Sequence, residues 1–287
     1  MKRIIVPYDF SDEARNGVSL ATVLASQTRA SIQLVYVQRK KPDFAHLSLE
    51  EERRLVEKEF DTLVAEIRKA LPQGIEVEYI VKKGKVYQEV VAQAEAFSDA
   101  VIVTSTHGAS GFEEFFLGSN TLKILASTEV PVYTIRHGMT PAPIQNVIFP
   151  LDTSFESRQK APITVKLAKQ WSATVHIVIE QAADSEEAKK LNAYTAQCEE
   201  YFAKNDVPYC TYRAEANKKE DLVDVTNNYA AHIPNSLIVV TTRDKAAPSI
   251  FMIGEKAQRL LRTAPVPVLV VVPTLVRITD SFRTSGN

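Results

Sequence analysis

The feature of this sequence that most constrains its fold is an internal repeat. The segment Ile4-Ile-Val-Pro-Tyr-Asp9 reappears as Val147-Ile-Phe-Pro-Leu-Asp152, at an offset of 143 residues. Near the ends of the two copies, Val130-Pro-Val132 reappears as Val266-Pro-Val268, at an offset of 136 residues. The joint, at residues 137–145, contains one glycine and two prolines, which interrupt helix and strand patterns. Two similar units therefore follow each other, the second slightly shorter.

Each unit alternates short apolar runs with helical segments. In the first unit we expect strands over 3–7, 31–37, 75–81, 100–104 and 132–135, with helices between them. The second unit repeats this order, with a helix expected over 156–170 after its first strand. Such alternation favours right-handed crossovers and a parallel sheet covered on both faces. The predicted fold is α/β, with two tandem flavodoxin-like or Rossmann-like domains, each a five-stranded parallel sheet flanked by helices. Their predicted bounds are 1–140 and 145–273, followed by a loose tail over 274–287.

Charge and hydropathy exclude several classes of protein. The chain carries 34 Lys and Arg against 35 Asp and Glu, and neither half has the basic excess with which a dedicated nucleic-acid binder neutralises phosphates. No window approaches the roughly 18 apolar residues of a membrane span, and the first apolar run is too short for a signal peptide. We expect a cytoplasmic protein. Its two cysteines, Cys198 and Cys210, fit no disulfide framework and are predicted to be buried or half-buried thiols.

A binding site is expected at the carboxyl ends of the strands, where ligands bind in parallel sheets. In the first unit this edge receives Asp9, the residues after Val37 and the loop Ser105–Gly118. Glycines at 108, 111 and 118 would let backbone amides approach a ligand, and the helix beginning at Ser119 would suit a phosphate. Seen alone, the loop could be an ordinary connection, and Asp9 could simply cap the helix that starts near Ser11.

Catalytic and metal-binding signals are absent from the sequence. The loop is not a Walker A motif, no G-x-G occurs, and no nucleophile–His–acid pattern is visible. His107 is expected to bond the loop backbone. The other histidines have no second ligand at a recognisable spacing: His46, His137, His176 and His232. We therefore predict no catalytic residue and no metal held by protein side chains.

Together these segments resemble the universal stress protein family, in a tandem form with two such domains in one chain. The resemblance rests on Val6-Pro-Tyr-Asp-Phe-Ser11, on Ser105-x-x-Gly108 followed by nine residues and Gly118-Ser119, and on the closing strand 130–135 with its copy at 266–271. It extends over residues 2–273. ATP-binding members of the family carry a glycine where this chain has Ser105.

The resemblance implies an ATP site in the first unit. Asp9 would bond the ribose or adenine beside Pro7, and the backbone of Val37 would meet the adenine edge. Thr104 and Ser105 would border the base and ribose. The phosphates would be held by Gly108, Gly118, Ser119 and Asn120, with Mg²⁺ or Mn²⁺ bridging their oxygens.

Two departures concern charge near the phosphates. The loop of the first unit has Glu113 and Glu114 where ATP-binding relatives often have a basic residue, and the run Arg39-Lys-Lys41 could compensate or simply be solvated. In the second unit, Asp244 stands where the first has Gly108, and Glu255 stands where it has Ser119. Carboxylates at these places oppose a triphosphate. We predict that the second unit does not bind ATP in this way.

The leading functional hypothesis is an ATP-binding regulatory protein of the stress response, with ATP in the first unit only. One alternative is a non-nucleotide scaffold of the same fold for an unknown protein partner. Another is a slow ATPase or an autophosphorylating protein that uses Ser119 or a nearby hydroxyl, since no cationic clamp for faster transfer is evident. Apolar edge strands at 132–135 and 268–272 predict that the units associate as a pseudo-dimer, and two chains could pair again.

Overall fold

A computed structural model describes residues 1–40, 47–106, 118–214, 220–242 and 253–273. The contacts within it divide the chain into unit one, Met1–Pro143, and unit two, Ile144–Asn287. The predicted domain limits at 140 and 145 fall on either side of this division. The predicted tail over 274–287 lies outside the described residues.

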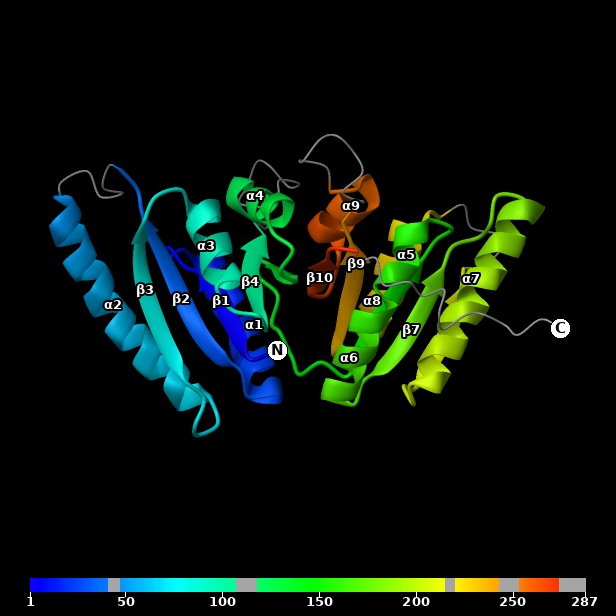
Figure 1. Ribbon diagram of the computed structural model, residues 1–287, viewed down its shortest axis with the longest axis horizontal. Coiled ribbons are helices and arrows are strands. Elements are labelled where there is room, and N and C mark those ends of the chain that lie inside the picture. The colour runs from blue at the N-terminus through cyan, green and yellow to red at the C-terminus, as the bar shows by residue number, and fades with distance from the viewer. Residues whose placement is uncertain (41–46, 107–117, 215–219, 243–252, 274–287) are drawn as a thin grey trace. The chain divides into compact units, whose positions relative to one another are not determined.

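Unit one alternates strands and helices from its first residues to its last (Figure 1). Its elements are β1 (Arg3–Pro7), α1 (Asp12–Thr28), β2 (Ser31–Gln38), α2 (Leu49–Ala70), β3 (Val77–Lys83), α3 (Val86–Glu95), β4 (Ala100–Thr106), α4 (Ser119–Ser127) and β5 (Val132–Arg136). The strand order is β3-β2-β1-β4-β5, and neighbouring strands run parallel. The chain therefore adds β2 and β3 on one side of β1 and then β4 and β5 on the other, so the strand order reverses between β1 and β4.

Unit two repeats this arrangement. Its elements are β6 (Asn146–Leu151), α5 (Phe155–Gln159), α6 (Ala161–Trp171), β7 (Thr174–Ile179), α7 (Ser185–Lys204), β8 (Tyr209–Arg213), α8 (Leu222–His232), β9 (Ser236–Thr241), α9 (Glu255–Thr263) and β10 (Val268–Val271). The order β8-β7-β6-β9-β10 mirrors that of unit one, again with parallel neighbours. The prediction of a five-stranded parallel sheet in each unit is confirmed. β5 and β10 are each the last strand on one side of their own unit's sheet.

The sequence dictates this fold through buried strands and capped helices. Ile4, Ile5 and Val6 are fully buried, as expected for a strand covered on both faces. In unit one α3 packs beside α4 on one face of the sheet. The connections through α1 and α2 run across the sheet in the opposite direction, so right-handed crossovers place these two helices on the other face. Helix α2 begins with a capping box, in which Ser48 and Glu51 each satisfy the other's backbone N–H group. The capping-box spacing in the sequence thus marks the true start of the helix.

One predicted helix is wrong. The segment 156–170 forms two helices, α5 and α6, that meet at Lys160. Pro162 cannot donate a backbone hydrogen bond to the preceding turn, so it ends one helix and opens the next. The buried Lys160 side chain also turns inward at this break, where its Nζ donates to the Pro150 carbonyl at 2.6 Å. The equivalent position in unit one is Gly17, and α1 is continuous there.

The two cysteines differ in exposure. Cys198 lies buried in α7, as predicted, whereas Cys210 is exposed. The prediction for Cys210 is wrong because it lies on β8, the last strand of its unit's sheet, which no further strand covers on that side.

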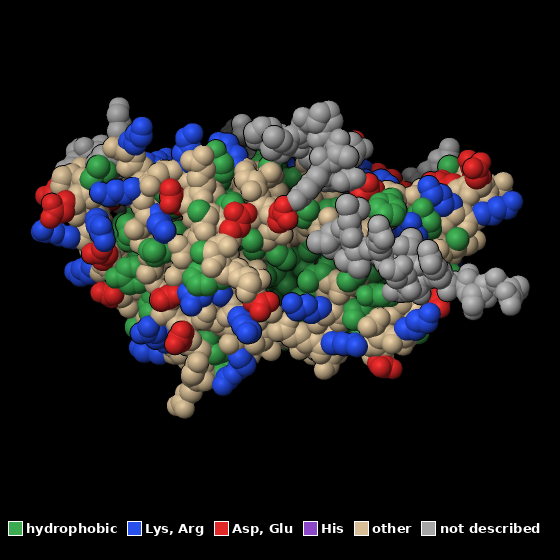
Figure 2. Space-filling view, in the orientation of Figure 1, with side chains coloured by type: hydrophobic (Ala, Val, Ile, Leu, Met, Phe, Trp, Pro, Cys, Tyr) green, Lys and Arg blue, Asp and Glu red, His purple; other side chains and the backbone are tan. Residues whose placement is uncertain are grey.

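The surface agrees with the near-zero net charge of the chain. Basic and acidic side chains are interspersed over the visible face (Figure 2). None of the helices that the structure describes is long and apolar enough to span a membrane.

Candidate functional site

A cavity of about 320 Å³ opens at the carboxyl ends of β1, β2 and β4 in unit one. It lies where the strand order reverses, the usual ligand position in such sheets. Six of the nine residues predicted for the nucleotide line it: Pro7, Asp9, Val37, Thr104, Ser105 and Asn120. Gly118 and Ser119 stand directly before Asn120, at the start of α4. Gly108 lies outside the described residues, as do His107, Glu113 and Glu114.

Asp9 presents its carboxylate at this edge. Its Oδ1 accepts hydrogen bonds from the Ser11 backbone N at 3.2 Å and from Ser11 Oγ at 2.6 Å. Ser11 Oγ accepts in turn from the backbone N of Ala14 and is the N-cap of α1. Ser11, rather than Asp9, therefore caps the helix. Within the described part of the chain, Oδ2 of Asp9 accepts no hydrogen bond and remains available to a ligand.

The strand ends around Asp9 form the walls of the cavity. The pairing of β1 with β2 ends at Pro7 and Val35, so β2 continues beyond its neighbour and brings Val37 to the cavity. On the other side, Thr121 Oγ1 donates to the Ser105 carbonyl at 3.1 Å and ties α4 to β4. Arg39 also lines the cavity and brings a cation to this edge.

The start of α4 suits an anion. Its N-cap is Gly118, which has no side chain that could accept a hydrogen bond from the first turn, and that turn contains no acidic residue. The first backbone N–H groups of a helix and the positive end of its dipole together favour a phosphate. Gly118 has φ −52° and ψ 135°, a conformation that other residues can adopt, so its contribution here is the absence of a side chain.

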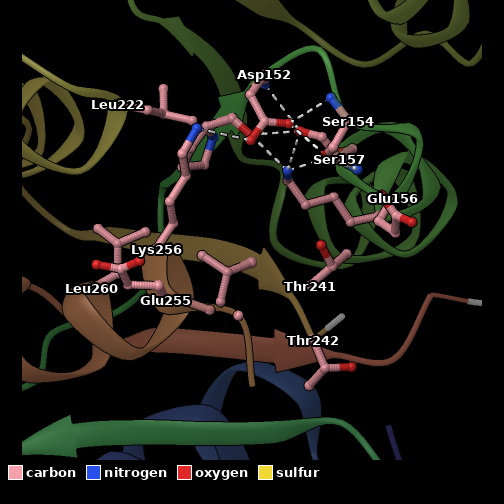
Figure 3. A pocket seen from close by; sticks show the side chains of 15 residues that line it. Asp152, Ser154, Glu156, Ser157, Leu222, Thr241, Thr242, Glu255, Lys256 and Leu260 are labelled. Carbon is pink, nitrogen blue, oxygen red and sulfur yellow. Dashed lines mark hydrogen bonds and ion pairs between the residues drawn. The ribbon is translucent and has the colours of Figure 1, made fainter. Parts of the chain in front are cut away.

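Unit two has a cavity of about 390 Å³ at the equivalent edge (Figure 3). Asp152 repeats the geometry of Asp9, because its Oδ1 accepts from the Ser154 backbone N at 3.0 Å and from Ser154 Oγ at 2.5 Å. Ser154 caps α5 as Ser11 caps α1. The repeat seen in the sequence therefore extends to individual hydrogen bonds.

An ion-pair network distinguishes the second cavity from the first. Lys256 Nζ lies 3.2 Å from Asp152 Oδ2 and 3.3 Å from Glu180 Oε1 (Figure 3 shows the contact with Asp152). Both carboxylate side chains are 21% exposed, so the lysine pairs two largely buried charges. Lys256, Asp152 and Glu180 together form what is called the unit-two clamp below.

The clamp occupies positions predicted for nucleotide in unit one. Pro150 pairs with Val178 as Pro7 pairs with Val35. Two residues after Val178, directly past the end of β7, lies Glu180, the counterpart of Val37. Helix α9 begins at Glu255 as α4 begins at Ser119, so Lys256 is the counterpart of Asn120. The sequence-based prediction for unit two rests on Asp244 and Glu255 and does not include Glu180 or Lys256. A full alignment of the two units on their strand ends would have found them.

Electrostatics reinforce the clamp. Burial alone would raise the pKa of Asp152, but hydrogen bonds from Ser154 and the charge of Lys256 outweigh it and lower this pKa to about 2. Burial would lower the pKa of Lys256, yet Asp152 and Glu180 raise it above its usual value. The fully buried amine of Lys160 faces the same cavity, and burial lowers its pKa to about 8. Asp152 and Lys256 thus stay ionised at neutral pH.

Glu255 lies at the first position of α9, where its carboxylate interacts favourably with the positive end of the helix dipole. The first turn of α4 has no such carboxylate. Asp244 lies outside the described residues. No group of three or more His, Cys, Asp or Glu side chains among the described residues could hold a metal ion.

Comparison with known proteins identifies the family. The model of the universal stress protein family matches residues 1–136 and again residues 143–272. The chain therefore belongs to the universal stress protein family and carries two of its domains in tandem.

Individual relatives match either about half of the chain or nearly all of it. A universal stress protein of Methanocaldococcus jannaschii is 25% identical over 139 residues, 47% of this chain and 82% of the relative. The universal stress protein YxiE of Bacillus subtilis is 26% identical over 148 residues, 47% of this chain and 98% of the relative. The crystal structure of a universal stress protein from Archaeoglobus fulgidus matches with a TM-score of 0.77 and 19% identity, covering 95% of this chain and 98% of that one. This last likeness concerns the fold.

Proposed function

We propose that this universal stress protein is a regulatory ATP-binding protein and that unit one alone holds the nucleotide. The observation that carries the proposal is the difference between two equivalent cavities. One has an accessible carboxylate and an uncapped helix start, whereas the other fills the same positions with its own charges.

The unit-one cavity supports the nucleotide through its polar groups. Asp9 Oδ2 is available to ribose hydroxyls, and Val37 lies beyond the end of β1, where the backbone of β2 can meet a base. Gly118 and Ser119 would offer backbone N–H groups to phosphates, with Arg39 as a cation at the same edge. Mg²⁺ or Mn²⁺ bound together with the nucleotide would offset the negative charge of its phosphates.

The unit-two clamp argues against the same ligand there. A ribose would have to displace Lys256 from Asp152, and the base would meet the carboxylate of Glu180 where unit one presents Val37. Phosphates would approach Glu255 at the start of α9. Each of these replacements costs ligand affinity, because a buried charge would lose its partner or face a like charge.

A regulatory role fits the chemistry of the unit-one cavity. Among the described residues that line it, the charged side chains are Asp9, Glu13 and Arg39. Rapid phosphoryl transfer generally relies on several cationic groups and metals gathered around the transferred phosphate. ATP would therefore act by stabilising one state of unit one, and hydrolysis would be slow.

Calorimetric titration of ATP–Mg²⁺ into nucleotide-free full-length protein tests the proposal. We expect one site per chain, lost in Gly118→Glu, because the new carboxylate would oppose the phosphates. The matched control is Gly254→Glu at the N-cap of α9, whose backbone angles are nearly the same and which should leave binding unchanged. Two sites per chain would overturn the argument from the clamp. No binding at millimolar ATP, checked by a second assay, would favour an interaction scaffold that needs no nucleotide.

The predicted association of the units through β5 and β10, and of two chains as a homodimer, belongs to this proposal as well. Both strands end the sheets of their own units and are apolar, with Val132, Tyr133 and Ile135 buried in β5.

A further inference from the structure

A cluster of four polar side chains lies on the sheet of unit two, on the face covered by α8. Asn146 comes from β6, His176 from β7, Cys210 from β8 and Tyr229 from α8. His176 and Cys210 are direct partners in the parallel register, so their side chains lie on the same face. All three strand residues lie in the first half of their strands, at the opposite end from the clamp.

The hydrogen bonds of this cluster fix the state of the imidazole. Asn146 Nδ2 donates to the Pro234 carbonyl at 2.9 Å, which turns Asn146 Oδ1 toward His176 Nε2, also at 2.9 Å. Because that oxygen only accepts, Nε2 carries the proton and Nδ1 is the acceptor. Cys210 Sγ lies 3.2 Å from Nδ1, and the Tyr229 hydroxyl lies 2.9 Å from it. A thiol thus faces a base whose orientation is held by a third group, which is the arrangement of activated nucleophiles.

Protonation states agree with this geometry. Burial lowers the pKa of His176, so the imidazole is neutral and can accept a proton at neutral pH. Burial, with Cys210 beside it, raises the pKa of Tyr229 to about 12. The phenol therefore stays protonated and can donate to a sulfur that becomes negatively charged.

Access distinguishes Cys210 from the second thiol of the chain. Cys210 is exposed on the outer strand of the sheet, while His176 behind it is buried. Cys198 is buried in α7, and burial raises its pKa to about 12. One thiol is therefore both reachable and next to a base, and the other is neither.

The four equivalent positions in unit one hold neither a thiol nor an imidazole. Strand register and helix position equate Asn146, His176, Cys210 and Tyr229 with Arg3, Gln33, Glu78 and Gln93. There Gln33 Nε2 donates to Glu78 Oε1 at 2.9 Å, and Gln93 Nε2 donates to Gln33 Oε1 at 2.8 Å. Arg3 Nη1 also donates to Glu78 Oε1. The fold thus satisfies these positions with a guanidinium, two amides and a carboxylate, and it does not require a thiol or an imidazole there.

We propose that Cys210 is a thiol-modification site that reacts with small-molecule disulfides, with His176 as its general base. The Cys210 sulfur attacks one sulfur of the disulfide and forms a mixed disulfide with the protein. The second half of the reagent leaves as a thiolate. The proton of Cys210 passes to His176 Nδ1 and then to a basic leaving thiolate such as that of glutathione, or to water where the leaving thiolate is too weak a base to take it. One disulfide and one thiol thus give one mixed disulfide and one thiol or thiolate.

The test is the rate at which full-length protein reacts with the chromogenic disulfide dithiobis(nitrobenzoate) and with oxidised glutathione at pH 7. We expect Cys210 to react at least about tenfold faster than N-acetylcysteine, as general-base assistance of a thiol predicts. Peptide mapping by mass spectrometry should place the adduct on Cys210. Cys210→Ser should abolish the fast reaction, and Cys198→Ala should leave it unchanged.

The decisive variant is His176→Gln, because unit one carries Gln33 at this position and the fold accommodates it. The rate at Cys210 should fall to that of N-acetylcysteine, while the fluorescence of the buried Trp171 verifies that unit two stays folded. A rate for Cys210 at or below that of the model thiol, or a rate unaffected by His176→Gln, would overturn the proposal. Since ATP is absent from the assay, the result is independent of the nucleotide proposal.

Discussion

The cavities at the carboxyl edges of the two units share a backbone and differ in charge. Asp9 and Asp152 follow the first strand of each unit and accept the same pair of hydrogen bonds from Ser11 and Ser154. In unit one the two positions that correspond to the other members of the clamp are neutral, with Val37 and Asn120 lining the cavity. In unit two the same positions are Glu180 and Lys256, and both join the aspartate in the clamp.

The difference shows how a duplicated fold can keep its architecture while one copy pairs the carboxylate at its strand edge with an internal cation. A lysine that reaches Asp152 supplies the neutralising contact that unit one leaves to a ligand or to water. The internal charge also ties three elements together, because Lys256 starts from α9 and its partners follow β6 and β7. On our proposal, the second cavity gains local stability where the first keeps its carboxylate available to the nucleotide.

Transferring the clamp into unit one should have the largest effect. In the double variant Val37→Glu with Asn120→Lys, we expect ATP affinity to fall about 100-fold, since Asp9 would lose its availability and a carboxylate would face the base, a loss of about 3 kcal/mol. Calorimetric titration measures it. The reciprocal pair Glu180→Val with Lys256→Asn is the control and should leave affinity for the first site unchanged. If the transferred pair left the affinity within threefold of wild type, the clamp would not explain the difference between the units.

The second-largest effect should come from acid, which weakens the clamp by protonating Asp152. Folding lowers the pKa of Asp152 from 3.8 to about 2, so between these values the unfolded chain binds more protons than the folded one. The stabilisation by this carboxylate is complete above pH 4 and is lost as the pH falls toward 2, a loss on the order of 2 kcal/mol in the unfolding free energy of unit two. Urea unfolding followed by the fluorescence of Trp171, the single tryptophan of the chain, reports on unit two.

Asp152→Asn is the reference for that measurement. The difference in unfolding free energy between wild type and variant should shrink as the pH falls from 4 to 2. A difference that stays constant over this range would show that Asp152 does not titrate within the clamp.

Removing the lysine should have the smallest effect. Lys256→Met leaves Asp152 and Glu180 without their partner, and we expect the unfolding free energy of unit two to fall by about 1 kcal/mol, because the lysine side chain is 49% exposed and partly screened by water. The same urea titration measures it near neutral pH. Lys189→Met, on the exposed face of α7, is the matched control and should change stability by less than about 0.5 kcal/mol. Equal effects of the two variants would reduce the clamp to an ordinary surface ion pair.

Much of the fold could be read from the sequence because it rests on local patterns. The repeated apolar strands, the glycine and prolines at the joint, and caps such as Ser48 with Glu51 act over a few residues. The prediction failed where burial decided, as at Lys160, whose inward side chain accompanies the break between α5 and α6. It failed again at Cys210, since nothing in the neighbouring residues shows that β8 is an outer strand.

The sequence by itself determined that the chain is a tandem α/β protein, and it predicted a ligand-binding edge in unit one. Strand periodicity, turn residues and the spacing from Ser105 to Ser119 carry that information along the chain. Only the tertiary structure decided which distant residues meet. Lys256 lies 104 residues from Asp152, and Cys210 lies 34 residues from His176. Their contacts depend on strand order and register, and these are set by the packing of the whole unit because a parallel sheet joins segments that the chain keeps far apart.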